Sequence, residues 1–274
     1  MSRSVLITGG SSGIGRAIVE RFAQAGDRVW FTYRSGQQRA LATELELSAR
    51  GWEVAGFELD QGNWPSHECL LMQLPGPVDV LVNNAAMGPK TIDRQLPGSA
   101  HQQAAAFLRI NSVGPLWLIQ QFLPGMLDRG YGKIINVSGV GGGVAAYPGL
   151  HVADGMSKAA VAYLTKHLAA ELVHQPVGVF AICPGVVATP RFEASTLAHL
   201  PALRRHELEA RLPQGRLIQP TEIAELVWWL TTGAAAVLHG SVIDASMGLG
   251  VHPGLLTGLD MGTGDVSDDD MGAA

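Results

Sequence analysis

The stretch Thr8-Gly9-Gly10-Ser11-Ser12-Gly13-Ile14-Gly15 decides the fold of this chain. The short apolar run Val5-Leu6-Ile7 precedes it and predicts a buried strand. Apolar residues at helical spacing follow it up to Gly26 and predict a helix. Glycines between a strand and a helix let free helix N–H groups approach a phosphate closely. An ordinary glycine-rich turn is the alternative, but the flanking strand and helix favour a dinucleotide site.

Length and composition predict one well-buried α/β domain, because the chain has 274 residues, 47% hydrophobic and 16% charged. The net charge of −5 comes without a basic stripe, which argues against nucleic acid as a partner. Cys69 and Cys183 are interpreted as buried thiols of a reducing, cytoplasmic compartment. The apolar run 226–238 is too short to span a bilayer and predicts a core helix. A first strand at Ser4 leaves no room for a signal peptide.

The spacing of Gly9, Gly13 and Gly15 is G-x-x-x-G-x-G, with Thr8 in front and Ile14 inside. In this the chain resembles the short-chain dehydrogenase/reductase family, and the resemblance extends over residues 4 to about 250. It implies a single α/β domain, 1–250, with a Rossmann-like, doubly wound parallel sheet between two layers of helices. It further implies a substrate lid at about 190–212. The remaining 251–274 form a Gly/Asp-rich tail, which we expect to be partly disordered, chiefly after Leu259.

The end of the second predicted strand, Val29 to Tyr33, bears on the choice of cofactor. An acidic residue here would accept hydrogen bonds from the adenine ribose of NADH. The chain instead has Tyr33 followed by Arg34. A guanidinium can bind a 2′-phosphate with two hydrogen bonds, so the sequence favours NADPH and NADP⁺. The alternative is that Arg34 is a solvated charge at a strand end.

Three more strand ends resemble cofactor-binding positions of the family. The third strand ends in Asp60-Gln61, where Asp60 is alternatively a helix N-cap. The fourth runs into Asn83-Asn84-Ala85-Ala86, whose amides have either a structural or a cofactor-binding role. Pro184 to Thr189 is similar to the family's Pro-Gly-x-x-x-Thr, which holds the nicotinamide end. The cofactor site expected from the resemblance is Gly9, Ser11, Ser12, Gly13, Ile14, Gly15, Tyr33, Arg34, Asp60, Gln61, Asn83, Asn84, Ala85, Lys158, Pro184, Gly185, Val187 and Thr189.

The catalytic positions depart from the family pattern. After the fifth strand the family has Asn-x-Ser-Ser, whose second Ser is catalytic, whereas this chain has Gly139 there. Strand alternation points the neighbouring Ser138 to the opposite face. The helix of the Tyr-x-x-x-Lys motif is identified by Ser157-Lys158-Ala159-Ala160, which makes Lys158 the active-site Lys. Four residues earlier the chain has Asp154 in place of Tyr.

Asp154 is a poor substitute for the phenol as a proton donor. A reference Asp pKa is ~3.9, and Lys158 one turn away would lower it further unless burial raises it strongly. We therefore expect an ion pair with Lys158, or a general base. Tyr147 and His151, in the preceding loop, are further candidates for the site.

Asn111 falls where the family keeps an Asn that holds a water in a proton relay to the Lys. It lies within a helical pattern from Gln102 to Met126 that Gly114-Pro115 interrupts. The alternative is an Asn that kinks its helix by bonding its own backbone. We expect Asn111, Lys158 and Asp154 to form the catalytic group, without a metal.

Two helices have apolar positions from which we predict their inner faces. For Gln38 to Arg50 the predicted inner residues are Leu41, Leu45 and Leu47. For the helix of Lys158 they are Met156, Ala159, Ala160, Tyr163, Leu164 and Leu168.

Together these patterns predict an NADPH-dependent reductase of a ketone or quinone in secondary metabolite or antibiotic biosynthesis. Its mechanism would lack the Ser–Tyr pair, as in some polyketide-tailoring ketoreductases. The resemblance also implies a small-molecule substrate and a homodimer or homotetramer, built from the helices that carry Asn111 and Lys158. One alternative is non-redox chemistry, a dehydratase, isomerase or cyclase with Asp154 or His151 as base. The other is a non-catalytic partner subunit.

Overall fold

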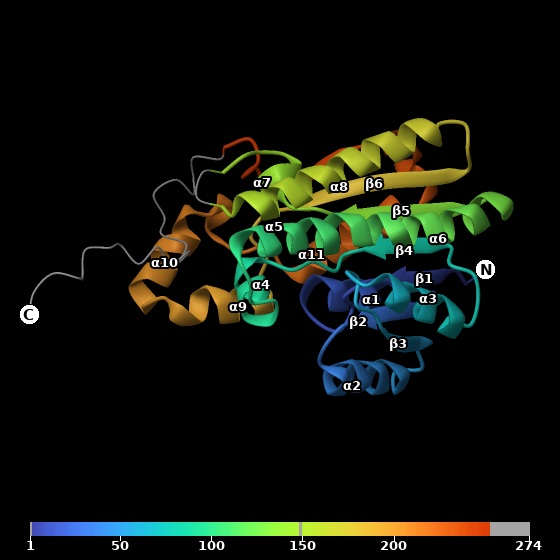
Figure 1. Ribbon diagram of the computed structural model, residues 1–274, viewed down its shortest axis with the longest axis horizontal. Coiled ribbons are helices and arrows are strands. Elements are labelled where there is room, and N and C mark those ends of the chain that lie inside the picture. The colour runs from blue at the N-terminus through green and yellow to red at the C-terminus, as the bar shows by residue number, and fades with distance from the viewer. Residues whose placement is uncertain (1, 148–149, 253–274) are drawn as a thin grey trace, which may run out of the picture.

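The computed structural model describes residues 2–147 and 150–252, and its centre is one parallel sheet (Figure 1). The seven strands have the order β3-β2-β1-β4-β5-β6-β7, which is the doubly wound arrangement predicted from the sequence. The strands are β1 (Ser4–Ile7), β2 (Arg28–Tyr33), β3 (Val54–Glu58), β4 (Val80–Asn83), β5 (Gly132–Val137), β6 (Val177–Pro184) and β7 (Val242–Ala245).

Helices connect the strands as right-handed crossovers require in a parallel sheet. The α-helices are α1 (Gly13–Gln24), α2 (Gln37–Ser48), α3 (Trp64–Gln73), α4 (Pro89–Gln95), α5 (Ala100–Leu108), α6 (Gly114–Asp128), α7 (Val140–Gly143), α8 (Val152–Glu171), α9 (Pro190–Ser195), α10 (Ala202–Arg211) and α11 (Pro220–Leu230). Shorter turns are the π-helix η1 (Arg109–Val113) and the 3₁₀ helices η2 (Leu197–His199), η3 (Pro213–Gly215) and η4 (Gly233–Leu238).

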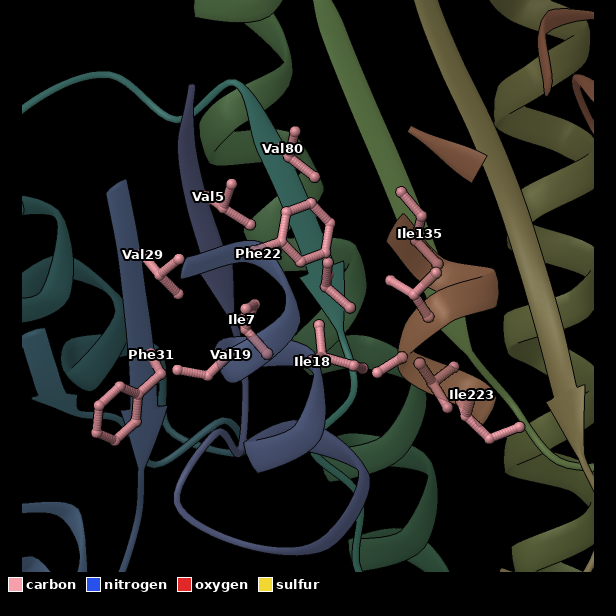
Figure 2. Packing of buried hydrophobic residues seen from close by; sticks show 14 of the residues in the cluster. Val5, Ile7, Ile18, Val19, Phe22, Val29, Phe31, Val80, Ile135 and Ile223 are labelled. Atoms are coloured by element: carbon pink, nitrogen blue, oxygen red, sulfur yellow. The ribbon is translucent and has the colours of Figure 1, made fainter. Parts of the chain in front are cut away.

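Both faces of the sheet are covered, which explains why its central strands are rich in buried apolar residues. On one face α1, α2 and α11 pack on the strands, with Phe22, Phe31 and Ile223 among the buried residues (Figure 2). On the other face α3, α6 and α8 pack around Leu81 and Leu118. Since the two helical layers bury the middle of the central strands, the open ends of these strands are where a ligand has access.

The predicted inner face of α2 is correct for Leu47 and wrong for Leu41 and Leu45, whose side chains are 54% and 62% exposed. The buried side of this helix has Ala40 and Thr43 instead. Polar contact explains the difference, because the α1 residue Arg16 donates a hydrogen bond of 2.8 Å to Thr43 Oγ1.

The predicted apolar face of α8 is correct for Leu168 and Leu164, which pack on the core, and wrong for the exposed Met156, Ala159 and Tyr163. Met156 and Tyr163 are exposed, whereas Ser157 and Thr165 are fully buried. Hydrogen bonds fix this rotation, because Asn136 of β5 donates to Thr165 Oγ1 at 2.9 Å. Polar residues whose hydrogen bonds are satisfied can occupy a buried face, and hydrophobic periodicity does not detect them.

The predicted helix from Gln102 to Met126 is in fact α5, the π-turn η1 and α6. The break therefore begins at Arg109, before Gly114-Pro115. Gly114 marks a close contact, since a Cβ on it would lie 2.4 Å from Gln61 Cγ.

The two cysteines differ in environment. Both are free; Cys183 is buried as predicted, and Cys69 is exposed, so the prediction was wrong there. None of the helices in residues 2–147 and 150–252 combines the length and hydropathy that a membrane span requires. Of the predicted tail 251–274, residues 253–274 lie outside the described part of the chain, and so does Leu259.

Candidate functional site

The predicted site residues gather beyond the carboxyl ends of the central strands, on the side of the molecule where α4, α9 and α10 lie (Figure 1). The chain leaves β1 toward one edge of the sheet and β4 toward the other. A crevice at such a switch point is the general ligand site of doubly wound sheets.

The glycine turn after β1 has little space for side chains. Gly9 and Gly13 have φ angles of +70° and +56°, which favour glycine. A Cβ on Gly15 would lie 2.2 Å from the carbonyl oxygen of Gly9. Helix α1 begins at Gly13, and the Ser12 side chain makes no capping hydrogen bond with it. The first N–H groups of α1 thus face the crevice without a side-chain cap, as an anion site requires.

The turns after β1 and β4 are joined by hydrogen bonds. The backbone N–H groups of Asn84 and Ala85 donate to Thr8 Oγ1 at 3.0 and 2.9 Å. Asn84 Nδ2 donates back to the Thr8 carbonyl at 2.9 Å. Deeper in the sheet, Asn83 donates to Asn136 at 2.9 Å. Both amides therefore have a structural role, which was one of the two alternatives.

Arg34 lies at the predicted end of β2 but is not a free, solvated charge. Its guanidinium donates hydrogen bonds to the side chain of Gln95 on α4 and, at 3.1 Å, to Met87 Sδ. The half-buried Tyr33 precedes it. The guanidinium thus joins the end of β2 to α4 and to Met87.

Asp60 and Gln61 lie in the turn between β3 and α3. The N-cap of α3 is Asn63, so the alternative of Asp60 as N-cap is wrong. Asp60 Oδ1 instead accepts the N–H of Gly62 within its own turn at 3.0 Å. The buried Gln61 Nε2 donates to the carbonyls of Ala85 and Ile110 at 3.1 and 2.7 Å, which holds the crevice wall to the π-turn.

Asn111 occupies that π-turn, a helix irregularity that often marks functional positions. Its Oδ1 accepts the N–H of Met87 at 2.8 Å, and its Nδ2 donates to the Met87 carbonyl at 3.0 Å and Ser157 Oγ at 3.2 Å. Nδ2 also approaches Asp154 Oδ1 at 3.5 Å. These partners come from other elements, so Asn111 joins the loop after β4 to α8 and does not kink its own helix.

Asp154 and Lys158 lie one turn apart on α8, but the expected ion pair is not formed. Among the described residues no nitrogen–oxygen approach within 4.0 Å joins them. Burial raises the pKa of Asp154, and the charges of Lys158, His151 and Arg191 offset only part of that effect. Burial likewise lowers the pKa of Lys158, with Asp154 opposing it. The expectation of a lowered Asp154 pKa was therefore wrong, because desolvation outweighs the attraction of Lys158.

Gly139 faces the side chain of Lys158, whereas Ser138 contacts only its backbone. A Cβ on Gly139 would lie 3.8 Å from Lys158 Cε, an ordinary contact distance. The hydroxyl of Ser138 donates to the Lys158 carbonyl at 2.8 Å, so it is bound to the helix backbone. The position beside the Lys158 side chain thus has room for a side chain but lacks one.

Tyr147 and His151 are held by contacts of their own. Tyr147 OH donates to the Leu249 carbonyl at 2.8 Å, and burial raises the pKa of its phenol. The ring of His151 stacks on Phe107, with 4.8 Å between ring centroids. In this arrangement the Tyr147 hydroxyl is already hydrogen-bonded to the segment after β7.

The segment from Pro184 to Thr189 is fixed by backbone hydrogen bonds to Ile218 at 2.8 and 3.0 Å. A Cβ on Gly185 would be only 3.0 Å from Ser246 Cβ. Thr189 Oγ1 accepts the N–H of Phe192 at 3.2 Å and caps α9. The Thr189 methyl lies against Gly13, since a Cβ there would be 3.2 Å from it. This segment and the glycine turn are therefore in contact at the carboxyl ends of the strands.

Arg191, which directly follows Thr189-Pro190, was not among the predicted site residues. The residue is exposed overall, although the protein around its guanidinium lowers the pKa by desolvation and the charge of Asp154 opposes this. It is thus a second cation near Lys158 and Asp154. Its place immediately after the cofactor motif was the one signal in the sequence that pointed to it.

Comparisons with known proteins agree with this geometry. The family described as enoyl-(acyl carrier protein) reductase matches residues 9–250. The chain belongs to the short-chain dehydrogenase/reductase family. A putative ketoacyl reductase of Streptomyces coelicolor is 34% identical, covering 91% of this chain and 97% of its own length. An acetoacetyl-CoA reductase of Rhizobium meliloti is 33% identical, covering 90% and 98%. This member of the short-chain dehydrogenase/reductase family is an NAD(P)-dependent oxidoreductase of C=O and CH–OH groups.

A solved structure of the family resembles the whole domain. A tryptophan variant of actinorhodin polyketide ketoreductase, crystallised with NADPH, has a TM-score of 0.80 and 33% identity. The match covers 91% of this chain and 97% of that one. The Rossmann-like fold of the short-chain dehydrogenase/reductase family is therefore established for this protein.

The environment of Asp154 leads to a prediction about stability. Since its pKa is higher in the folded state, the group contributes stability at low pH that is lost as pH rises through the folded pKa. Asp154→Asn keeps the shape but has no charge, so we expect it to raise the Tm at pH 8 by about 2–4 °C, as ~1 kcal/mol would. The gain should shrink as pH falls, which calorimetry across pH 4–8 measures.

The matched control is Asp93→Asn, on the exposed side of α4. It removes a carboxylate that is already exposed to solvent, so the free energy of unfolding should change by no more than about 0.5 kcal/mol. A Tm of Asp154→Asn equal to or below that of wild type at pH 8 would contradict the buried-carboxylate interpretation.

Proposed function

We propose that the protein is an NADPH-dependent reductase of a ketone or quinone that works without a Ser–Tyr pair, in the biosynthesis of a secondary metabolite. One observation carries the proposal. The elements that face a dinucleotide are complete, whereas the two positions that would face the carbonyl hold Gly139 and Asp154. Polyketide and ketoacyl reductases among the relatives support the substrate class and the biosynthetic role.

The residues present fit a bound dinucleotide. There is no space for a Cβ at Gly15, and the start of α1 has no side-chain cap, so its free N–H groups suit a pyrophosphate. Thr189 and Lys158 would hold the nicotinamide end, and Arg34 the 2′-phosphate of the adenosine. The NADPH complex of the polyketide ketoreductase supports NADP(H) over NAD(H).

The bound cofactor supplies a hydride to the carbonyl carbon, and the remaining need is a proton for the carbonyl oxygen. Gly139 has no hydroxyl, and Ser138 is engaged with the α8 backbone. Asp154 keeps one oxygen near the Asn111 amide, which holds it at the edge of the site. We propose that the substrate carries an acidic hydroxyl beside its carbonyl, and that this hydroxyl delivers the proton. Lys158 and Asn111 then serve to orient cofactor and substrate.

The first test is a fluorescence titration with NADPH and NADH. We expect wild type to bind NADPH more tightly. Arg34→Ala should weaken NADPH binding about 10- to 100-fold, because hydrogen bonds to a charged group are lost, and should leave NADH unchanged. The control Arg50→Ala removes an arginine from beyond the far end of α2, where it pairs with Glu46. An equal loss for both cofactors in Arg34→Ala would refute the 2′-phosphate contact.

The second test is turnover of NADPH with pairs of substrates. Each pair is a hydroxy-ketone, with the hydroxyl beside the carbonyl, and its methyl ether. We expect the ether to react ~10²–10⁴-fold more slowly, the usual contribution of general acid catalysis. Asp154→Asn should change kcat by less than about 10-fold on the hydroxy-ketone.

A loss of 10²-fold or more in Asp154→Asn, with NADPH binding intact, would assign proton transfer to Asp154 itself. If no ketone or quinone oxidises NADPH, the reductase proposal fails. Non-redox chemistry or a partner role then becomes the better explanation, and capture of an active homologue in the native host separates the two.

We also propose that two copies pair through the outer face of α8. Val152, Met156 and Tyr163 leave 74%, 54% and 68% of their surface exposed there, and they follow one another at helical spacing. The resemblance places the family's dimer faces on the helices that carry Lys158 and Asn111, here α8 and the helical segment around η1. A second copy would bury this apolar stripe against its own.

The oligomeric state tests this pairing. Sedimentation of wild type should give at least twice the chain mass of 28.9 kDa, and the double variant Met156→Glu/Tyr163→Glu should lower it toward one chain. The control Leu203→Glu alters a 70%-exposed leucine on α10 and should keep the wild-type mass. A wild-type monomer at micromolar concentration would disprove the pairing.

A further inference from the structure

His67, near the start of α3, is a fully buried histidine that the proposed reaction does not use. Its ring stacks on Trp64 of the same helix, with 6.1 Å between ring centroids. It also lies nearly perpendicular to the ring of Trp117 on α6, with 5.3 Å between centroids. Packing against two helices therefore fixes the direction in which the ring nitrogens of His67 point.

The Nε2 atom of His67 lies 3.0 Å from the backbone carbonyl oxygen of Gln61. A carbonyl only accepts hydrogen bonds, so Nε2 carries the hydrogen and donates it. Burial lowers the pKa of this imidazole, which keeps the ring neutral near pH 7. Within residues 2–147 and 150–252 no other group donates to this carbonyl. On α6, a Cβ on Gly114 would be only 2.5 Å from the same oxygen, so the carbonyl depends on His67 for its hydrogen bond.

The side chain of Gln61 extends this hydrogen bonding to two further segments. The residue is only 4% exposed. Its Nε2 donates to the carbonyl of Ala85 in the loop after β4, at 3.1 Å, and to that of Ile110 in the π-turn η1, at 2.7 Å. Asn111 is the next residue of that π-turn. One residue in the turn after β3 thus joins two segments of the candidate site, and His67 holds that residue from the side of α3.

The turn after β3 adjoins the place proposed above for the adenosine phosphate. Strands β2 and β3 pair with Tyr33 beside Glu58, and the N–H of Leu59 donates to the Tyr33 carbonyl at 2.8 Å. Arg34, which we assign to the 2′-phosphate, directly follows Tyr33. A shift of the turn that carries Gln61 would therefore disturb the adenosine end of the cofactor site.

We propose that His67 is a positioning residue for NADPH, whose N–H holds the Gln61 turn in the conformation that binds the adenosine half of the cofactor. The inference rests on the cofactor site proposed above and adds a residue outside that site which sets its affinity. His67 acts through Gln61 and does not touch the cofactor. A buried carbonyl without a donor is costly, so loss of the His67 N–H would favour conformations in which the turn reaches water.

Substitutions of His67, with fluorescence titration of NADPH, test the inference without turnover. His67→Phe keeps an aromatic ring but removes the donor, and we expect its Kd to rise about 10-fold. His67→Gln carries an amide N–H close to the place of Nε2 and should bind within about 2-fold of wild type. His67→Asn, whose shorter amide does not reach the Gln61 carbonyl, should show the loss of the Phe variant and replaces it if that variant does not fold. Rescue by Gln alone separates the hydrogen bond from the packing of the ring.

The action through Gln61 is tested by a double-mutant cycle. Gln61→Met keeps the length of the side chain without its donors and should also weaken NADPH binding. His67→Phe/Gln61→Met should bind no more weakly than the weaker single variant, because the two residues act as one unit. In the free protein, His67→Phe should speed hydrogen exchange in residues 84–86 and 110–113, and His67→Gln should not.

The control Glu68→Gln changes an exposed carboxylate on the same helix, which accepts the Trp64 indole N–H at 3.0 Å, and should leave the Kd unchanged. Equal NADPH affinity of His67→Phe and wild type would overturn the proposal, and so would additive losses in the double variant. A wild type that binds neither NADPH nor NADH would reject the proposed cofactor site, and the role of His67 with it. Binding of NADPH without oxidation by any ketone would reject the reductase function alone and leave the His67 result standing.

Discussion

The close approach of the turns after β1 and β4 is the constraint on which the rest of the site depends. Gly15 lies so near the Gly9 carbonyl and Asn84 Nδ2 that a Cβ would be 2.2 and 2.6 Å from them. The hydrogen bonds between Thr8 and Asn84 hold the turns at this separation. Because each turn continues a buried strand, the crevice is as rigid as the sheet. Asn111 and Gln61 then extend the same rigidity to the wall formed by η1 and α8.

Desolvation determines the electrostatics at this crevice. The i,i+4 spacing of Asp154 and Lys158 on α8 would favour an ion pair on an exposed helix. In the folded protein the surroundings raise the pKa of the carboxyl and lower that of the amine, so each is shifted toward its neutral form. Shifts of this kind concentrate at functional sites, where unpaired charges are available to a ligand.

The strand-turn-helix at the start could be predicted because it depends on a local pattern, namely an apolar run followed by glycines that leave no space for side chains, and the doubly wound sheet was expected from the family resemblance. The faces of α2 and α8 could not be predicted, because Thr43 and Thr165 are buried through hydrogen bonds to distant residues. The pKa direction of Asp154 depended on burial, which the sequence does not contain. Arg191 was overlooked for a related reason, since its neighbours come from α8 and are 33 or more positions away in the sequence.

The missing side chain at Gly139 is not a consequence of packing. Gly142 and Gly143, in the same loop, have no room, because Cβ atoms would lie 2.1 Å from the Gly155 carbonyl and 2.5 Å from Cys183 Sγ. At Gly139 the nearest atom would be 3.8 Å away, and its φ of −172° suits any residue. A serine would therefore fit beside Lys158 without strain. The fold permits the usual hydroxyl and the chain does without it, which supports the proposal that the substrate itself protonates the reacting oxygen.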